Sequence, residues 1–243
     1  MSGRLEGKVA VITGAGRGIG KAIALAYGRH GVAVGCIART PAEIRVTAEE
    51  IVKAGGRALA TPADVRDRRA VEAAFDETSR EFGGLDIVVI NAGANRDHAP
   101  VDAGDPEAWR ETIDTNLIGA YYCARAAIPH LKQRGAGKII TLGSGIGHRG
   151  FAERSAYACS KAGLWMLTRV LAQELAPYNI SVNELIPGPV DTSMNPGGSG
   201  TSTLGASEWL KRPEDVVPLA LFLAEQPDVG PTAQSFSLMR RDT

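Results

Sequence analysis

The chain has 243 residues, 44% of them hydrophobic, and its 27 Lys and Arg residues balance its 27 Asp and Glu residues. This composition suits one packed α/β core, and the zero net charge disfavours nucleic acid, an anionic membrane and acidic partners, so a small-molecule partner is expected. No apolar run reaches the roughly 18 residues of a membrane span, and the first residues do not resemble a secretory signal, so a cytoplasmic protein is expected.

The cysteines and histidines show no spacing typical of a disulfide framework or a metal site. Cys36, Cys123 and Cys159 are far apart and form no CxxC pair, so we expect buried free thiols. The four histidines form no HExxH or other paired motif. The sequence therefore predicts no metal.

Apolar segments of strand length alternate with segments of 3.6-residue periodicity along the whole chain. The expected strands are 8–13, 32–38, 57–61, 85–90, 138–143, 180–186 and about 234–239. The expected helices are 18–30, 41–54, 67–82, about 106–131, about 156–176 and about 213–224. Because strands that alternate with helices run parallel and are covered on both faces, we predict a doubly wound α/β sheet of about seven strands in a single domain, 1–243.

Two segments, 93–105 and 187–207, interrupt the alternation of strands and helices. Each follows an expected strand, and loops at the carboxyl ends of parallel strands line the ligand crevice. The second segment is rich in Gly, Ser and Thr, so we expect a substrate lid within 187–212. A solvated connector without a role is the alternative for most of it.

A glycine-rich turn, TGAGRGIG over 13–20, joins the first expected strand to an amphipathic helix. Glycines let the backbone approach a pyrophosphate closely, and the free N–H groups and dipole at the helix start attract its negative charge. Such a turn alone is not specific, because methyltransferases also place glycines after their first strand. It indicates dinucleotide binding only together with other motifs.

Tyr157 and Lys161 lie four residues apart in the expected helix 156–176 and therefore share one face. A phenol has a reference pKa of about 10, and a nearby ammonium group stabilises its anionic form. Ser144, in the turn after strand 138–143, could hydrogen-bond a substrate oxygen. The pattern predicts general acid catalysis by Tyr157 on a carbonyl oxygen, and general base catalysis on an alcohol in the reverse direction.

The TGxxxGIG spacing resembles the short-chain dehydrogenase/reductase family, and further motifs follow in that family's order. Asp64-Val65 corresponds to the position at the adenine edge, Asn91-Ala92-Gly93 to the NAG motif, and Tyr157 to Lys161 to the YxxxK motif. The resemblance covers about residues 5–239 and implies a Rossmann-type fold. It also implies NAD(P)(H)-dependent hydride transfer between a nicotinamide ring and a carbonyl or alcohol carbon.

The resemblance further assigns roles to individual residues. It implies that Asn116, Ser144, Tyr157 and Lys161 are catalytic, that Lys161 also binds the nicotinamide ribose, and that Asn116 holds a water in a proton relay. The implied cofactor-binding residues are Gly14, Arg17, Gly18, Ile19, Gly20, Arg39, Asp64, Val65, Asn91, Ala92, Gly93, Tyr157, Lys161, Pro187, Gly188, Val190 and Thr192. The four catalytic residues have plainer alternatives: Tyr157 and Lys161 could be a surface pair, Ser144 a turn residue and Asn116 a satisfied helix amide.

Within the family, the segments NRD at 95–97 and KIITLGS at 138–144 are closest to the 3-oxoacyl-thioester (acyl-carrier-protein) reductases. A carbonyl reductase is therefore expected, with an NAD-dependent secondary alcohol or sugar dehydrogenase as the alternative. A non-catalytic dinucleotide sensor and a methyltransferase are the alternatives from other classes. The resemblance, with the long helices 106–131 and 156–176, also implies a homotetramer, and a dimer is the alternative.

The end of the second expected strand bears on the choice of cofactor. NAD-selective sites place a carboxylate there, which binds the ribose 2′-hydroxyl and repels a 2′-phosphate, but this chain has Ala38. Arg39 follows, and Arg17 lies in the glycine-rich turn, so two guanidinium groups could bind the phosphate. We predict that NADP(H) is preferred and NAD(H) is possible; two solvated surface arginines are the alternative.

Overall fold

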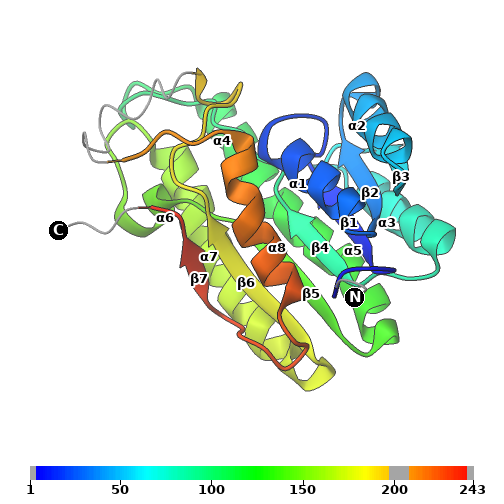
Figure 1. The fold of residues 1–243 in the computed structure, drawn as a ribbon. Helices are drawn as coiled ribbons and strands as arrows, with labels where there is room; N and C mark the ends of the chain where they lie inside the picture. Colours follow the sequence, from blue (N-terminus) through cyan, green and yellow to red (C-terminus); the bar gives the residue numbers. More distant parts are fainter. Residues whose placement is uncertain (1–3, 197–207, 240–243) are drawn as a thin grey trace.

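The computed structural model describes residues 4–196 and 208–239. Within them, seven parallel strands form one sheet in the order β3-β2-β1-β4-β5-β6-β7 (Figure 1). The strands are β1 Val9–Thr13, β2 Ala33–Ala38, β3 Arg57–Pro62, β4 Ile87–Ile90, β5 Gly137–Leu142, β6 Ile180–Ile186 and β7 Ser235–Ser237. The prediction of a doubly wound α/β sheet of seven strands is confirmed.

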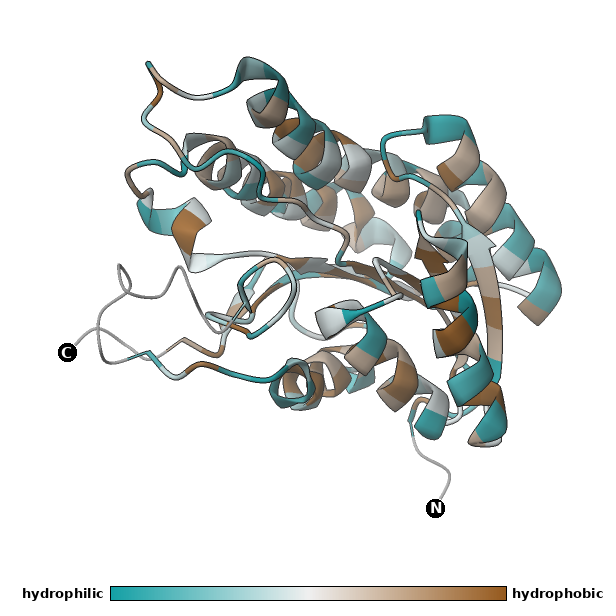
Figure 2. Cartoon of the chain, turned by 90° about the horizontal axis from the view of Figure 1, so that it is seen from above, coloured by the Kyte–Doolittle hydropathy of each residue, from teal (hydrophilic) through white to brown (hydrophobic). Residues whose placement is uncertain are grey.

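Helices cover both faces of this sheet, as the view from above shows (Figure 2). Helices α1, α2 and α8 contribute to one hydrophobic cluster and α3, α5 and α7 to the other. The helices are α1 Gly18–Arg29, α2 Pro41–Lys53, α3 Arg68–Phe82, α4 Pro106–Ile113, α5 Gly119–Arg134, α6 Gly145–Arg149, α7 Ser155–Leu175 and α8 Val217–Glu225. Short turns of other helix types, at Asp114–Ile118, Ala176–Tyr178 and Pro213–Val216, adjoin α5, α7 and α8.

Strand β1 shows why the strands are continuous apolar runs. Val9 and Val11 belong to the cluster on the α3, α5 and α7 face, whereas Ala10 and Ile12 belong to the cluster on the opposite face. Successive side chains of a strand point to opposite faces, so a strand covered on both sides needs apolar residues at every position.

The strand order places a ligand crevice beside β1. This strand pairs with β2 on one side and with β4 on the other, so the order reverses here. In an open parallel sheet, a ligand binds at such a reversal, beyond the carboxyl ends of the strands. The glycine-rich turn follows β1 and Asn91 follows β4, so the topology brings these two motifs together.

Two local features differ from the sequence prediction. The helix expected over 106–131 consists of α4, a π-helical turn at Asp114–Ile118, and α5. Such π turns inside α-helices frequently occur at functional sites. Helix α6 was not predicted, and its first turn is capped by Ser144, whose hydroxyl accepts a hydrogen bond from the Ile146 N–H at 3.3 Å.

In the part of the chain that is described, no helix combines the length and apolarity that crossing a membrane requires.

Candidate active site

A pocket opens at the carboxyl ends of β1 to β4, where the topology predicts a ligand. It combines the glycine-rich turn, the end of β2, the loop after β3 and the NAG motif. Its lining is Gly14, Gly16, Arg17, Gly18, Ile19, Ala38, Arg39, Thr40, Glu43, Ala63, Asp64, Val65, Asn91, Ala92, Gly93, Thr115, Thr192, Ser193 and Met194. Most of the predicted cofactor residues therefore surround one space, although Gly20, Tyr157, Lys161, Pro187, Gly188 and Val190 do not line it.

Close contacts leave no room for a side chain at Gly14 and Gly20 of the glycine-rich turn. Gly14 has a φ of +69°, and a Cβ there would lie 2.7 Å from Asn91 Nδ2. A Cβ on Gly20 would overlap the Gly14 carbonyl oxygen. The turn leads into α1, which has no side-chain cap at Arg17 and no acidic residue in its first turn. The narrow backbone and the uncapped N–H groups fit a dinucleotide pyrophosphate.

Asn91 and Thr13 brace the turn against β4. Asn91 Nδ2 donates to the Thr13 carbonyl at 2.8 Å, while the buried Thr13 hydroxyl accepts from the N–H groups of Asn91 and Ala92 at 3.0 and 3.1 Å. Asn91 therefore shapes the pocket through the backbone of the glycine-rich turn. Thr13 was not among the predicted site residues, although it is the first residue of the TGxxxGIG motif.

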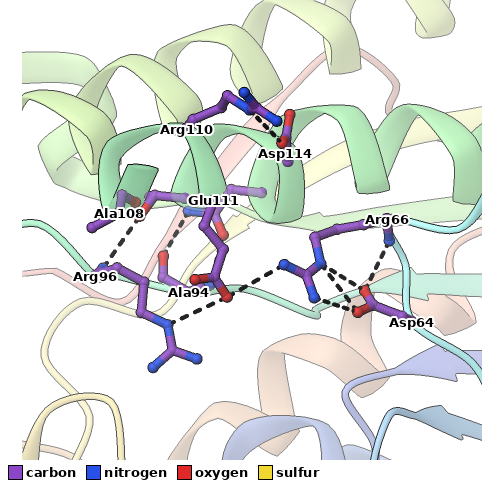
Figure 3. A network of polar contacts seen from close by, with 10 residues as sticks. Asp64, Arg66, Ala94, Arg96, Ala108, Arg110, Glu111 and Asp114 are labelled. Carbon is purple, nitrogen blue, oxygen red and sulfur yellow. Dashed lines mark hydrogen bonds and ion pairs between the residues drawn. The ribbon is translucent and has the colours of Figure 1, made fainter. Parts of the chain in front are cut away.

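Asp64 lies at the pocket in a chain of ion pairs (Figure 3). Arg66 Nη2 lies 2.7 Å from Asp64 Oδ2, and Glu111 Oε1 lies 3.4 Å from Arg66 Nη1 and 3.7 Å from Arg96 Nε. Partial burial raises the pKa of Asp64, but the hydrogen bonds and charge of Arg66 outweigh it, so the pKa lies below its ordinary value. Asp64 is therefore a carboxylate that can accept a hydrogen bond from an adenine amine.

Arg17 and Arg39 both line the pocket, beside Ala38. The Arg17 guanidinium lies 3.5 Å from a carboxylate oxygen of Glu43 on α2. The charge of Arg39 helps to lower the pKa of Asp64, so the Arg39 guanidinium acts on that carboxylate. Sequence reasoning missed Glu43, because nothing in the chain order shows that α2 faces the glycine-rich turn.

Tyr157 and Lys161 lie on α7, and Ser144 lies in the turn before α6. The Ser144 hydroxyl lies close enough to the Tyr157 phenol to lower its pKa. Lys161 is 4% exposed, and its Nζ donates to the Leu142 carbonyl at 2.7 Å and lies 5.7 Å from the centre of the Tyr157 ring. The fold thus brings three of the four predicted catalytic side chains together, outside the lining of the pocket described above.

Burial dominates the proton affinities at this site. It raises the pKa of Tyr157 above its ordinary value, and the nearby Ser144 hydroxyl opposes this only in part. Burial also lowers the pKa of Lys161 to about 8, opposed by the negative charge of Glu184. With its pKa raised, the Tyr157 phenol is protonated at neutral pH, as a proton donor must be.

Asn116 lies in the π-helical turn, 1% exposed, with its amide fully engaged. Its Oδ1 accepts from the Ala94 N–H at 2.7 Å, and its Nδ2 donates to the Ala94 carbonyl at 2.8 Å and to Ser160 Oγ at 2.9 Å. The side chain ties the loop after β4 to α7. Both hydrogens of the Asn116 amide therefore already make hydrogen bonds. A water of the predicted proton relay would have to donate to an oxygen atom of Asn116.

The segment after β6 passes over the glycine-rich turn. Pro187 and Val190 are buried, Gly188 has a φ of +68°, and a Cβ on Gly18 would lie 3.4 Å from the Thr192 methyl carbon. Residues 197–207 of the expected lid lie outside the described residues.

Two of the three cysteine thiols are buried, as the sequence predicted, and one is exposed. Cys36 and Cys123 are buried, and burial raises the pKa of each to about 12. Cys159 is exposed, so the prediction of a buried thiol was wrong there. The reason is helical geometry: two residues beyond Tyr157, the side chain points away from the buried face of α7.

The comparisons with known proteins agree on one family. Residues 8–199 match the family model described as short chain dehydrogenase. The short-chain reductase protein NovJ of Streptomyces niveus is 37% identical over 91% of this chain and 88% of that protein. A 3-ketoacyl-ACP reductase from Sinorhizobium meliloti 1021 superimposes with a TM-score of 0.86 at 38% identity, covering 95% of this chain and 96% of the other.

A carveol dehydrogenase from Mycobacterium avium, solved in complex with NAD, has a TM-score of 0.91 at 28% identity and covers 97% of both chains. The relatives share the Rossmann-type fold and are oxidoreductases of CH–OH or C=O groups. The protein therefore belongs to the short-chain dehydrogenase family and is an oxidoreductase that acts on such groups with a nicotinamide cofactor.

Proposed function

We propose that the protein is an NADPH-dependent carbonyl reductase that acts on 3-oxoacyl thioesters or other ketones. The observation that carries this proposal is the Tyr157 phenol, which is protonated at neutral pH and lies close to Ser144 and to the buried Lys161. A protonated phenol suits reduction, in which the substrate oxygen gains a proton.

In this reaction Ser144 hydrogen-bonds the substrate oxygen and holds the carbonyl against Tyr157. When bound, the nicotinamide supplies the hydride to the carbonyl carbon. Tyr157 donates its phenolic proton to the oxygen, and the Lys161 ammonium stabilises the phenolate that remains. Asn116 keeps the loop after β4 in place against α7. In the reverse direction the phenolate accepts the alcohol proton.

The preference for NADP(H) rests on the end of β2. Ala38 leaves no carboxylate there to repel a 2′-phosphate, and Arg39 lines the pocket beside it. One observation favours the alternative, an NAD-dependent secondary alcohol or sugar dehydrogenase: Glu43 pairs with Arg17 and adds a negative charge to the pocket.

We also propose that chain 1–243 is one catalytic domain with its substrate lid within 187–212, and that it assembles as a homotetramer or dimer. Exposed apolar side chains on or beside α5 and α7 support association, namely Ile118, Tyr121, Met166 and Val170. Light scattering should give a multiple of the chain mass, and a monomer at micromolar concentration would contradict this.

The function is tested by following nicotinamide absorbance with NADPH or NADH and a panel of ketones, β-ketoesters and quinones. At least one ketone should be reduced faster with NADPH, and β-ketoesters should rank above simple ketones. Tyr157→Phe serves as the inactive control. Oxidation of secondary alcohols with NAD, without reduction of any ketone by NADPH, would favour the alternative.

A further inference from the structure

A buried carboxylate lies beside the catalytic residues without a role in the reaction as derived above. Glu184, in the middle of β6, is 0% exposed. Its oxygens accept hydrogen bonds from His148 Nε2 at 3.0 and 3.3 Å and from Ser235 Oγ at 2.5 Å. A charged group is costly to bury unless it is paired and hydrogen-bonded, so this strand position is held by specific contacts.

The carboxylate lies against the turn that carries the catalytic serine. A Cβ on Gly143 would overlap Glu184 Oε1, so only glycine fits at the residue before Ser144. Leu142, one residue earlier, accepts the hydrogen bond from Lys161 Nζ. Glu184 and Lys161 thus contact adjacent residues of the same turn.

Helix α6 connects the carboxylate to the same site from the other side. Ser144 caps the start of α6, and His148 in its last turn hydrogen-bonds Glu184. The His148 ring also packs on Trp165 of α7, with ring centres 4.9 Å apart. A Cβ on Gly147 would lie 2.7 Å from backbone and side-chain atoms of Lys161, so α6 packs directly on α7 there.

We propose that Glu184 is a positioning residue of the catalytic site: its carboxylate balances the charge of the Lys161 ammonium and, through His148, holds helix α6 in place. The consequence for catalysis rests on the proposed function, because Lys161 must be charged to stabilise the Tyr157 phenolate and α6 sets the position of Ser144.

The negative charge of Glu184 affects the protonation of Lys161. Burial lowers the pKa of Lys161 to about 8, and the negative charge of Glu184 acts in the opposite direction. Without that charge, Lys161 would lose its proton at a still lower pH. Among the described residues, His148 of α6 hydrogen-bonds Glu184, and the Tyr157 ring of α7 lies 5.7 Å from Lys161 Nζ. The Arg169 guanidinium lies 5.6 Å from the centre of the Trp165 ring, on which His148 packs.

The first test compares Glu184→Gln, which keeps the shape and removes the charge, with Glu174→Gln, which makes the same change at an exposed position of α7. Competitive acetylation of the cofactor-free protein over a pH series, read by mass spectrometry of the peptide with Lys161, reports the pKa of Lys161 directly. We expect it to fall by about one unit in Glu184→Gln, since an opposite charge nearby shifts a pKa by that order. Glu174→Gln should match the wild type.

This measurement needs no substrate, so it separates the inference from the proposed function. An unchanged Lys161 pKa in folded Glu184→Gln protein would overturn the charge role even if the enzyme reduced ketones. A lowered Lys161 pKa in Glu184→Gln, together with a wild-type protein that lacks reductase activity, would support the charge role of Glu184 and count against the proposed function. If far-UV circular dichroism shows that Glu184→Gln is unfolded, Glu184→Asp replaces it: the retained charge should keep the Lys161 pKa within about half a unit of wild type, and a fall of a full unit would overturn the inference.

The second test addresses α6. His148→Phe retains a ring against Trp165 but removes the hydrogen bond to Glu184. We expect kcat to fall about tenfold with little change in KM for NADPH, because the hydrogen bond positions Ser144 and not the nucleotide. The pKa of Lys161 should stay near its wild-type value, because Glu184 itself is unchanged in this variant. A wild-type kcat, or an equal loss of NADPH affinity, would contradict the positioning of α6.

Discussion

Replacing Arg39 by Ala should weaken the use of NADPH far more than the use of NADH. Arg39 lines the nucleotide pocket next to Ala38, where a 2′-phosphate would lie in the proposed complex. A hydrogen bond to a charged group contributes about 1.5–3 kcal/mol, so kcat/KM for NADPH should fall about ten- to hundredfold. Arg17 is exposed and already paired with Glu43 at 3.5 Å, so Arg17→Ala should lose only about 0.5–1 kcal/mol, or two- to fivefold.

The assay is the initial rate of nicotinamide oxidation at a fixed, saturating ketone concentration, with each cofactor varied. The double variant Ala38→Asp with Arg39→Ala should move the preference to NADH, because the new carboxylate accepts from the ribose hydroxyl and repels the phosphate. Glu43→Gln is the matched control: it frees Arg17 and should favour NADPH. If Arg39→Ala changed kcat/KM equally for both cofactors, or if the wild type used NADH at least as well as NADPH, the reasoning would be refuted.

Three further outcomes are expected. Tyr157→Phe removes the transferable proton and should abolish turnover while NADPH affinity, measured by fluorescence titration, stays near wild type; retention of most of the wild-type kcat would disprove the role. Because Lys161 has a pKa of about 8 and works as a cation, kcat/KM should fall as the pH rises above about 8, where the ammonium loses its proton; a flat profile to pH 10 would contradict this. Gly20→Ala should prevent cofactor binding because its Cβ overlaps the Gly14 carbonyl. Gly55→Ala has no atom within 4 Å of its Cβ and lies outside the pocket lining, so it should still bind NADPH in the same titration, although the φ of +89° at Gly55 should cost it some stability.

The architecture could be predicted from the sequence because the relevant signals are local. Continuous apolar segments such as Val9–Thr13 indicate strands buried on both faces, and their alternation with helices indicates a parallel sheet. The i, i+4 spacing of Tyr157 and Lys161 likewise places both on one face of a helix before any tertiary contact is known.

Which distant side chains meet, and how they change each other's proton affinity, could not be predicted before the fold was known. Glu184 and His148 are 36 residues apart, and a lone carboxylate within an apolar strand carries no sign of its partner. The π turn at Asn116 was equally invisible, because it accompanies hydrogen bonds to Ala94 and Ser160 that come from other elements. Hydrophobic periodicity shows which face of each segment is buried. The proton affinities of Tyr157 and Lys161 depend instead on desolvation, which occurs only when the sheet and the helices pack together.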